Sequence, residues 1–248
     1  MHSILKALAD KYEVLSFTDE DPSQFLRWYK KSSAIADIET ASFIAAMLAF
    51  GSRTQFIPKI KEILQTADKT SGSITAWLKT GAYKKDFPTG AKKFYRFYSY
   101  DDMQAFFGEL AAILNSSKSL GEFFKTRWGQ TSTHLADIIS QSFPNSRIVP
   151  KGRSSANKRI HMFLRWMVRQ NSPVDLGLWK WYPQAVLLIP LDVHVMQEAQ
   201  KLGLLPPKAS ASRKTAEELT KKMNEIFPGD PARADYALFG LGVAPDLC

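Results

Sequence analysis

"LLIPLDVHVMQEAQKLGLL", residues 187–205, joins an apolar run to an amphipathic segment through a single aspartate, Asp192. From Val193 onward the apolar residues recur at helical spacing, and Gly203 is typical of the position just beyond a helix. Asp192 is therefore predicted at the N-cap, where its carboxylate accepts backbone N–H groups and is stabilised by the helix dipole. A cap alone would explain this residue, but a carboxylate held rigidly at a helix N-terminus is also suited to catalysis.

Helical spacing of apolar residues extends through most of the chain. We predict helices within 36–52, 54–69, 102–117, 119–129, 131–143, 154–170, 193–202, 212–227 and 230–243, the last closed by Gly240 or Gly242. The one segment that suggests a strand is AVLLIPL, and Pro190 limits it. The predicted fold class is all-α: one two-lobed helical domain over residues 1–248, with a weak internal division near 85–95.

Composition narrows the class of protein. The chain has 248 residues, of which 45% are hydrophobic, and it contains no uninterrupted apolar run of membrane-spanning length. Its single cysteine, Cys248, excludes an intramolecular disulfide, a cysteine-ligated zinc site and an iron–sulfur cluster within one chain. The four histidines are scattered singly, so we predict no metal site. We expect a soluble, cytoplasmic monomer without a cofactor and without a membrane partner.

The charge favours an anionic partner. The net charge is +9, and residues 147–169 contain seven Lys and Arg residues but no Asp or Glu. On one element this window would form a positive surface that can displace counterions from phosphates. The alternative is a solvated helix face whose acidic neighbours lie elsewhere in the fold.

Four stretches carry a family resemblance: ASFIAAMLAFGSRTQFIPKIKEIL, VPKGRSSANKRIHMFL, PLDVHVMQEAQKLGLL and FPGDPARADYALFGLG. In this order they resemble the helix-hairpin-helix DNA glycosylase superfamily, which includes endonuclease III, the adenine glycosylases and the 8-oxoguanine glycosylases. The resemblance implies a two-lobed fold of that type, double-stranded DNA as the partner, and Asp192 as the catalytic carboxylate. It also implies contacts to the nucleic acid from the hairpin, the basic helix and the turn of the early helix pair, through Lys151, Gly152, Arg153, Ser154, Arg159, Arg165, Arg53 and Gln55.

A lysine that attacks the sugar follows the hairpin in the bifunctional members of that superfamily. Ser154 occupies this register here, and Lys151 replaces a hairpin glycine. The nearest helical lysine is Lys158, one turn further on and 34 residues before Asp192 (192 − 158), so Lys158 is our candidate nucleophile. The alternative is a lysine that contacts a phosphate or is merely solvated.

Aromatic side chains could stack on an extruded base, and the candidates are Trp166, Trp179 and Trp181. Trp166 lies at helical spacing, which favours core packing over stacking. The segment LWKWYP is harder to explain as core because it falls in a predicted loop.

Over its whole length the chain also resembles a bacterial family known only as a domain of unknown function, through RFY, FLRWMVR, DLGLWK, PLDVHV and YALFGLGV. That family brings no established activity with it, so the expected reaction follows from the glycosylase resemblance: a protein that flips a base out of DNA and cleaves its N-glycosidic bond. The alternatives are an inactive nucleic-acid-binding module on the same fold, an enzyme that acts on RNA or a nucleoside, and a scaffold for an acidic protein.

Overall fold

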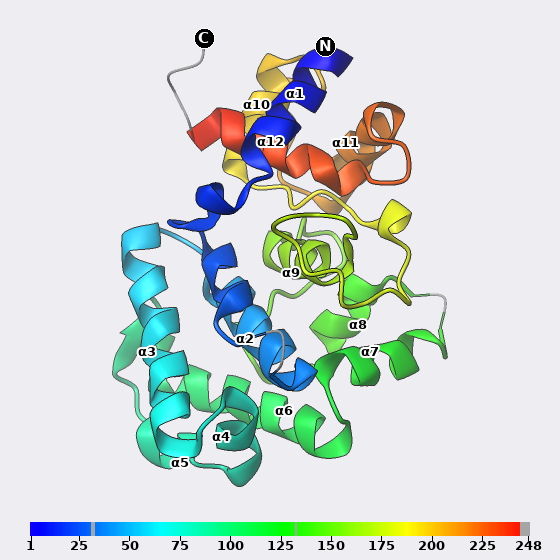
Figure 1. Cartoon of the computed structure of the whole chain (residues 1–248). Coiled ribbons are helices and arrows are strands. Elements are labelled where there is room, and N and C mark those ends of the chain that lie inside the picture. The colour runs from blue at the N-terminus through cyan, green and yellow to red at the C-terminus, as the bar shows by residue number, and fades with distance from the viewer. Residues whose placement is uncertain (31–32, 132, 244–248) are drawn as a thin grey trace. The chain divides into compact units, whose positions relative to one another are not determined.

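The computed structural model describes residues 1–30, 33–131 and 133–243, so Cys248 lies outside the described residues. Helices dominate the described residues (Figure 1), and the predicted all-α fold class is confirmed. Their one sheet is a short antiparallel pair, β1 (Lys93–Tyr95) with β2 (Tyr98–Ser99). The segment AVLLIPL forms no strand: Gln184–Val186 is a short 3-10 helix, η3, and the residues after it are irregular.

The chain forms two compact units, each described here by itself. Unit 1 combines Met1–Asp19 with the described part of Lys151–Cys248, and unit 2 is Glu20–Pro150. The boundaries in the sequence are therefore 19/20 and 150/151, and residues 85–95 lie inside unit 2.

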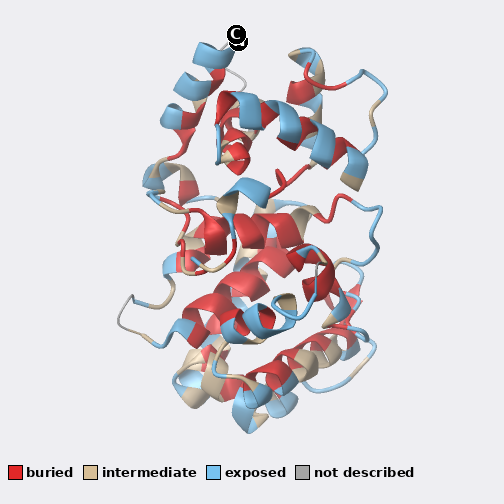
Figure 2. Ribbon diagram, turned by 90° about the vertical axis from the view of Figure 1, so that its right-hand side faces the viewer, coloured by how far each residue is buried: buried red, intermediate tan, exposed pale blue. Residues whose placement is uncertain are grey.

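Unit 2 is built around an almost completely buried helix. Its helices are η2 (Pro22–Arg27), α2 (Ile35–Leu48), α3 (Arg53–Ser71), α4 (Ile74–Thr80), α5 (Tyr83–Asp86), α6 (Tyr100–Ser116), α7 (Leu120–Trp128) and α8 (Leu135–Gln141). Every residue of α2 from Ala36 to Leu48 is buried, and α2 contacts η2, α3, α4 and α7. It stays buried although it contains Asp37 and Glu39, because these carboxylates accept hydrogen bonds from the backbone N–H groups of Thr75 and Gly121. Figure 2 marks the buried residues in red.

Unit 1 is assembled from both parts of its sequence. Its helices are α1 (His2–Tyr12), η1 (Leu15–Thr18), α9 (Lys158–Val168), η3, α10 (Val193–Lys201), α11 (Arg213–Ile226), η4 (Pro231–Arg233) and α12 (Ala234–Val243). Helix α12 packs against both α1 and α10. A β-carbon at Gly240 would lie 2.2 Å from the Tyr12 ring, so only glycine permits this approach of α12 to α1.

Each predicted helix overlaps a helix of the structure, but most of the bounds differ. Ser212 caps α11 and Asp192 caps α10, both as predicted. Gly240 and Gly242 do not close the last helix but lie inside α12, because other helices pack closely over them. Within 131–143, α8 covers only Leu135–Gln141, and residue 132 lies outside the described residues. Helices α1, α4 and α5 were not predicted.

Candidate functional site

Asp192 is the N-cap residue of α10, as the sequence predicts. Its backbone is extended (φ −115°), and its Oδ1 accepts a hydrogen bond of 2.9 Å from the backbone N–H of Val195. The second carboxylate oxygen is not used by the cap. The side chain is 18% exposed, so this carboxylate is fixed by the helix and still accessible to a solute.

Lys158 is the first residue of α9, and it meets Asp192. Its Nζ lies 3.4 Å from Asp192 Oδ2 and 6.0 Å from the centre of the Phe239 ring on α12. A cation at a helix N-terminus is disfavoured by the helix dipole, and the first turn of α9 contains no acidic residue. The Asp192 carboxylate therefore offsets an unfavourable position of the lysine. The structure thus brings together the two residues that the sequence predicts as catalytic.

An exposed basic loop leads into Lys158. Its residues Lys151, Gly152, Arg153 and Ser154 are all exposed. Gly152 has φ +94°, and no heavy atom lies within 4 Å of the position of a β-carbon there. A glycine at positive φ with open space above it leaves the backbone accessible to a ligand.

Hydrogen bonds within unit 1 fix this loop in place. The Asn157 side chain donates to the Gly152 carbonyl (2.9 Å), and the backbone N–H of Arg213 donates to the Ser154 carbonyl (2.8 Å). Ser155 forms an isolated bridge with Ser212, next to the N-terminus of α11. Hydrogen bonds to the carbonyl groups of Gly152 and Ser154 therefore anchor the loop. Arg159, beside Lys158, is half-buried.

Arg165 lies away from the surface on which the sequence prediction placed it. It is only 6% exposed, and it forms an ion pair with Asp235 through Nη1. Its Nε lies 3.4 Å from Asp175 Oδ1, and its guanidinium lies 4.2 Å from the centre of the Tyr236 ring. A guanidinium so enclosed leaves no face for a phosphate, which corrects its assignment as a nucleic-acid contact.

Arg165 belongs to an extended cluster of charges in unit 1. We call it the arginine network, and its members are Glu13, Arg165, Arg169, Asp175, Asp230 and Asp235. Arg169 lies at its centre: Nη1 donates to Glu13 (2.8 Å) and Asp175 (2.5 Å), and Nε donates to Asp230 (2.8 Å). Two of the seven basic residues in 147–169, Arg165 and Arg169, are therefore neutralised in the interior by acidic residues outside that window.

Burial and ion pairing shift the titration of this network. Burial raises the pKa of Asp235 to about 6; Arg165 opposes that shift, Asp192 adds to it, and Lys158 reduces it. Burial would also raise the pKa of Glu13, but Arg169 and Arg233 outweigh it and lower the pKa below its ordinary value. Asp235 therefore takes up a proton at a higher pH than an ordinary aspartate does.

The three predicted stacking tryptophans differ in exposure. Trp166 is fully buried in α9, and Trp179 is 1% exposed, packed at 84° against the Phe163 ring. The Trp179 backbone N–H donates to the Met167 carbonyl (2.8 Å), which fixes this loop on α9. Neither indole has a face open to a base, so the structure places both in the core. Trp181 is half-buried and stacks on Trp179 at a centroid distance of 5.4 Å.

Arg53 and Gln55 lie in unit 2, at the N-terminus of α3. The predicted helix pair is present as α2 and α3, joined by residues 49–52, with Ser52 as the N-cap of α3. Gln55 is exposed, and Arg53 is half-buried with its Nη2 3.8 Å from Asp21 Oδ2. Both side chains therefore belong to the first turn of a helix and not to the turn before it.

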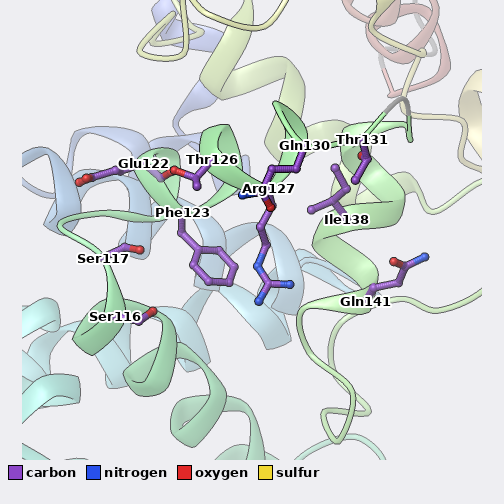
Figure 3. Close-up of a pocket in the computed structure, with 10 residues that line it drawn as sticks. All are labelled: Ser116, Ser117, Glu122, Phe123, Thr126, Arg127, Gln130, Thr131, Ile138 and Gln141. Carbon is purple, nitrogen blue, oxygen red and sulfur yellow. The ribbon is translucent and has the colours of Figure 1, made fainter.

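Unit 2 also contains a hollow that the sequence did not indicate. It has a volume of about 710 Å³ and lies between the end of α6 and helices α7 and α8. In Figure 3 the Arg127 and Phe123 side chains lie side by side in it, and the guanidinium is 4.5 Å from the ring centre. The other lining residues are Ser116, Ser117, Glu122, Thr126, Gln130, Thr131, Ile138 and Gln141. None of the predicted site residues lines this hollow, and its polar residues follow no motif.

The described part of the chain contains neither a metal-binding cluster nor a membrane-spanning helix. Within residues 1–30, 33–131 and 133–243, no group of three or more His, Cys, Asp or Glu residues is arranged to hold a metal ion. No helix among these residues is both long enough and apolar enough to cross a bilayer.

A family model described as "Protein of unknown function (DUF2400)" matches residues 21–244. The match includes every predicted site residue, and it begins after α1 and Glu13. No curated protein and no solved structure matches the chain.

Proposed function

This chain belongs to the DUF2400 family, and we propose that it is a DNA base-excision glycosylase-like protein on a two-lobed fold of the helix-hairpin-helix glycosylase type. In this proposal Asp192 is the catalytic carboxylate and Lys158 is its partner. The observation that carries the proposal is the 3.4 Å ion pair between these two residues, at the N-termini of two helices and within reach of solvent. Both residues are also the catalytic candidates that the sequence predicts.

The geometry of Asp192 suits cleavage of an N-glycosidic bond. As the base departs, the sugar becomes cation-like, and an ionised carboxylate beneath it lowers the energy of that state. The hydrogen bond from the Val195 N–H fixes one carboxylate oxygen, so little reorganisation is needed during the reaction. In the hydrolytic reaction, water adds its hydroxyl to the sugar carbon, and the leaving base takes the bonding electrons and a proton.

Lys158 supports two versions of this chemistry. As an ammonium it would hold a phosphate or orient Asp192. As a free amine it would form a bond to the sugar carbon, displace the base with its electron pair, and yield a Schiff base after the sugar ring opens. Both versions need a nucleotide turned out of the duplex toward the pair.

The basic loop supports binding of a nucleic-acid backbone. Lys151 and Arg153 are exposed and directly flank Gly152, whose backbone is accessible. Hydrogen bonds to the carbonyl groups of Gly152 and Ser154 anchor the loop. Phosphate contacts of this kind position a protein on DNA without reading its sequence. The loop precedes Lys158 directly, so a bound phosphate would lie on the same side of unit 1 as the beginning of α9.

The test is a panel of duplexes that carry oxidised, alkylated or deaminated bases. The purified protein is incubated with each duplex, and one half is treated with borohydride while the other half is treated with alkali. Strand cuts revealed by alkali, and lost in Asp192→Asn, are expected for a hydrolytic glycosylase. A covalent protein–DNA species trapped by borohydride, and lost in Lys158→Ala, is expected if the lysine attacks the sugar.

The matched control is Lys201→Ala, which removes a lysine from the other end of α10, where it pairs with Glu198. This variant should behave as wild type. If no duplex is cut or trapped while salt-dependent binding is measurable and unchanged in Asp192→Asn, the enzyme proposal is wrong and Asp192 is only a helix cap.

A further inference from the structure

The hollow of unit 2 contains a cation that has no counterion within the described part of the chain. The hollow has a volume of about 710 Å³ and lies between the end of α6 and helices α7 and α8. Among the described residues that line it, Arg127 is the only cation and Glu122 the only acid. Arg127 is exposed, and it forms no ion pair with any described residue. The charge of this guanidinium is therefore available to a ligand.

The Phe123 ring limits how the Arg127 guanidinium is presented. Phe123 precedes Arg127 by one turn of α7, and the guanidinium carbon lies 4.5 Å from the ring centre. Figure 3 shows the two side chains projecting side by side into the hollow. A guanidinium that lies over an aromatic ring keeps N–H donors free along its edge. Because the ring already restricts its motion, less conformational entropy is lost when these donors bind an anion.

Glu122 does not neutralise Arg127. Its Oε2 accepts a hydrogen bond of 3.2 Å from the backbone N–H of Lys118, which holds the carboxylate at the beginning of α7. In Figure 3 the Glu122 side chain points away from Arg127. The hollow therefore has a negative end and a positive end, and the charged group of an anionic ligand belongs beside Arg127.

Side-chain amides and hydroxyls form most of the remaining lining. Among the described residues, the side chains of Ser117, Gln130 and Gln141 have no hydrogen-bond partner. The hydroxyls of Ser116 and Thr126 already donate to helix carbonyl groups (2.9 and 3.0 Å), so their oxygens remain as acceptors. Such a lining can both donate hydrogen bonds to the hydroxyl groups of a ligand and accept hydrogen bonds from them.

We infer that this hollow is a binding site for a small hydroxylated organic anion, a phosphate monoester or a carboxylate. Its charged group pairs with Arg127, and its hydroxyl groups contact Ser117, Gln130 and Gln141. A guanidinium matches either oxyanion through two parallel N–H···O bonds. The volume lies within the range of about 300–1,000 Å³ that is usual for small-molecule sites. All of these residues belong to unit 2 and none to the Lys158–Asp192 pair, so the inference does not rest on the proposed function.

Binding to the whole chain tests the site directly. Inorganic phosphate, ribose 5-phosphate and gluconate are each titrated by calorimetry, and the Nε–H signal of Arg127 is followed by NMR in protein labelled with ¹⁵N-arginine. Ribose 5-phosphate or gluconate should bind saturably, at least about 5-fold more tightly than inorganic phosphate, because only they have hydroxyl groups to pair with the amides. The tighter of the two identifies the charged group as a phosphate monoester or a carboxylate.

Three substitutions assign the binding to the hollow. Arg127→Gln should raise the dissociation constant about 10- to 100-fold, because the charged donors are lost. Lys125→Gln is the matched control: it removes an exposed cation from the same helix, outside the hollow, and should change the dissociation constant by less than about 2-fold. Phe123→Leu should raise it about 2- to 5-fold and should also shift the Arg127 Nε–H signal in the ligand-free protein, since the ring current is gone.

Arg127→Lys provides a second variant at an exposed position. It keeps the charge but not the two parallel donors, and it should weaken binding about 10-fold. Circular dichroism checks that each variant is folded. The inference is overturned if neither organic anion binds saturably to wild type, or if Arg127→Gln and Lys125→Gln weaken binding equally.

Discussion

The Lys158 ammonium lies 3.4 Å from the Asp192 carboxylate, although 34 residues separate the two in the sequence (192 − 158). Each residue stands at the beginning of its own helix, α9 or α10. The contact therefore depends on the relative placement of two helix N-termini, and its two members can be changed one at a time without touching the interior.

Asp192 acts both as a helix cap and as a negative charge, and substitutions can separate these two roles. Asparagine caps a helix as well as aspartate does, so Asp192→Asn should keep the free energy of unfolding within a few tenths of a kcal/mol. Asp192→Ala should lose about 1 kcal/mol. Any base-excision rate should fall by roughly 100-fold or more in both, because the charge is gone. Urea unfolding and a duplex-cutting assay measure the two effects. Full activity in Asp192→Asn would assign the residue to the cap alone.

Lys158→Arg tests what the amine does. Arginine preserves a cation opposite Asp192, but a guanidinium does not form a Schiff base. We expect hydrolytic cutting within about 10-fold of wild type and complete loss of any species trapped by borohydride. Lys158→Met, which removes the charge as well, should lower both hydrolytic cutting and borohydride trapping. Trapping that persists in Lys158→Arg would mean that another amine attacks the sugar.

Lys151 and Arg153 should contribute to binding through phosphates. Each cation that contacts DNA adds about 0.9 to the slope of log affinity against log salt concentration. The double variant Lys151→Gln/Arg153→Gln should therefore reduce this slope by about 1.8 for any duplex, whatever its sequence. Fluorescence anisotropy at several salt concentrations measures it, with Lys201→Gln as the control. An unchanged slope would remove the loop from the DNA-binding surface.

Arg169 should be critical for stability. It holds Glu13, Asp175 and Asp230 together, and its removal leaves three carboxylates without their common partner. Breaking a buried ion pair on one side costs about 3–5 kcal/mol, so Arg169→Met should lower the free energy of unfolding by that amount. Arg153→Met, an exposed change in the same basic window, should stay within about 0.5 kcal/mol. Equal losses of unfolding free energy in Arg169→Met and Arg153→Met, measured by urea unfolding, would contradict a stabilising role of the arginine network.

The Asp235 carboxyl should make stability depend on pH. Its pKa is raised from 3.8 to about 6, so between these values the folded protein keeps a proton that the unfolded chain has lost. Its contribution to stability is therefore complete below about pH 4 and is lost as the pH rises to about 6, by an amount of about 3 kcal/mol. The difference in unfolding free energy between wild type and Asp235→Asn should change by this amount from pH 4 to pH 7. A constant difference would show that Asp235 titrates alike in both states.

Local patterns explain which parts of the structure were predictable. The cap at Asp192 and the start of α11 at Ser212 follow from a polar residue placed just before an amphipathic repeat. The early helix pair follows from apolar spacing. In each case the information lies within one or two helical turns. The meeting of Lys158 with Asp192 was anticipated only through a family resemblance, because no local pattern links the two helices.

Long-range packing explains the rest. Arg165 and Arg169 stand in a window without acidic residues and so look like surface charges, but their partners come from α1, the loop after α9, and the segment around α12. Trp179 lies in a loop, yet its backbone is bonded to α9 and its ring is buried. The hollow beside Arg127 draws its lining from three helices. Composition and periodicity contain no information about such distant partners.

Unit 1 begins with α1 and ends with α12, while unit 2 is continuous in the sequence between them. During translation, all of Glu20–Pro150 is made before any residue from Lys151 onward. Unit 2 can therefore finish folding before α12, the helix against which α1 packs, has been synthesised. Glu13 must remain hydrated until Arg169 and Arg233 have left the ribosome, so residues synthesised late decide when residues synthesised early reach their folded positions.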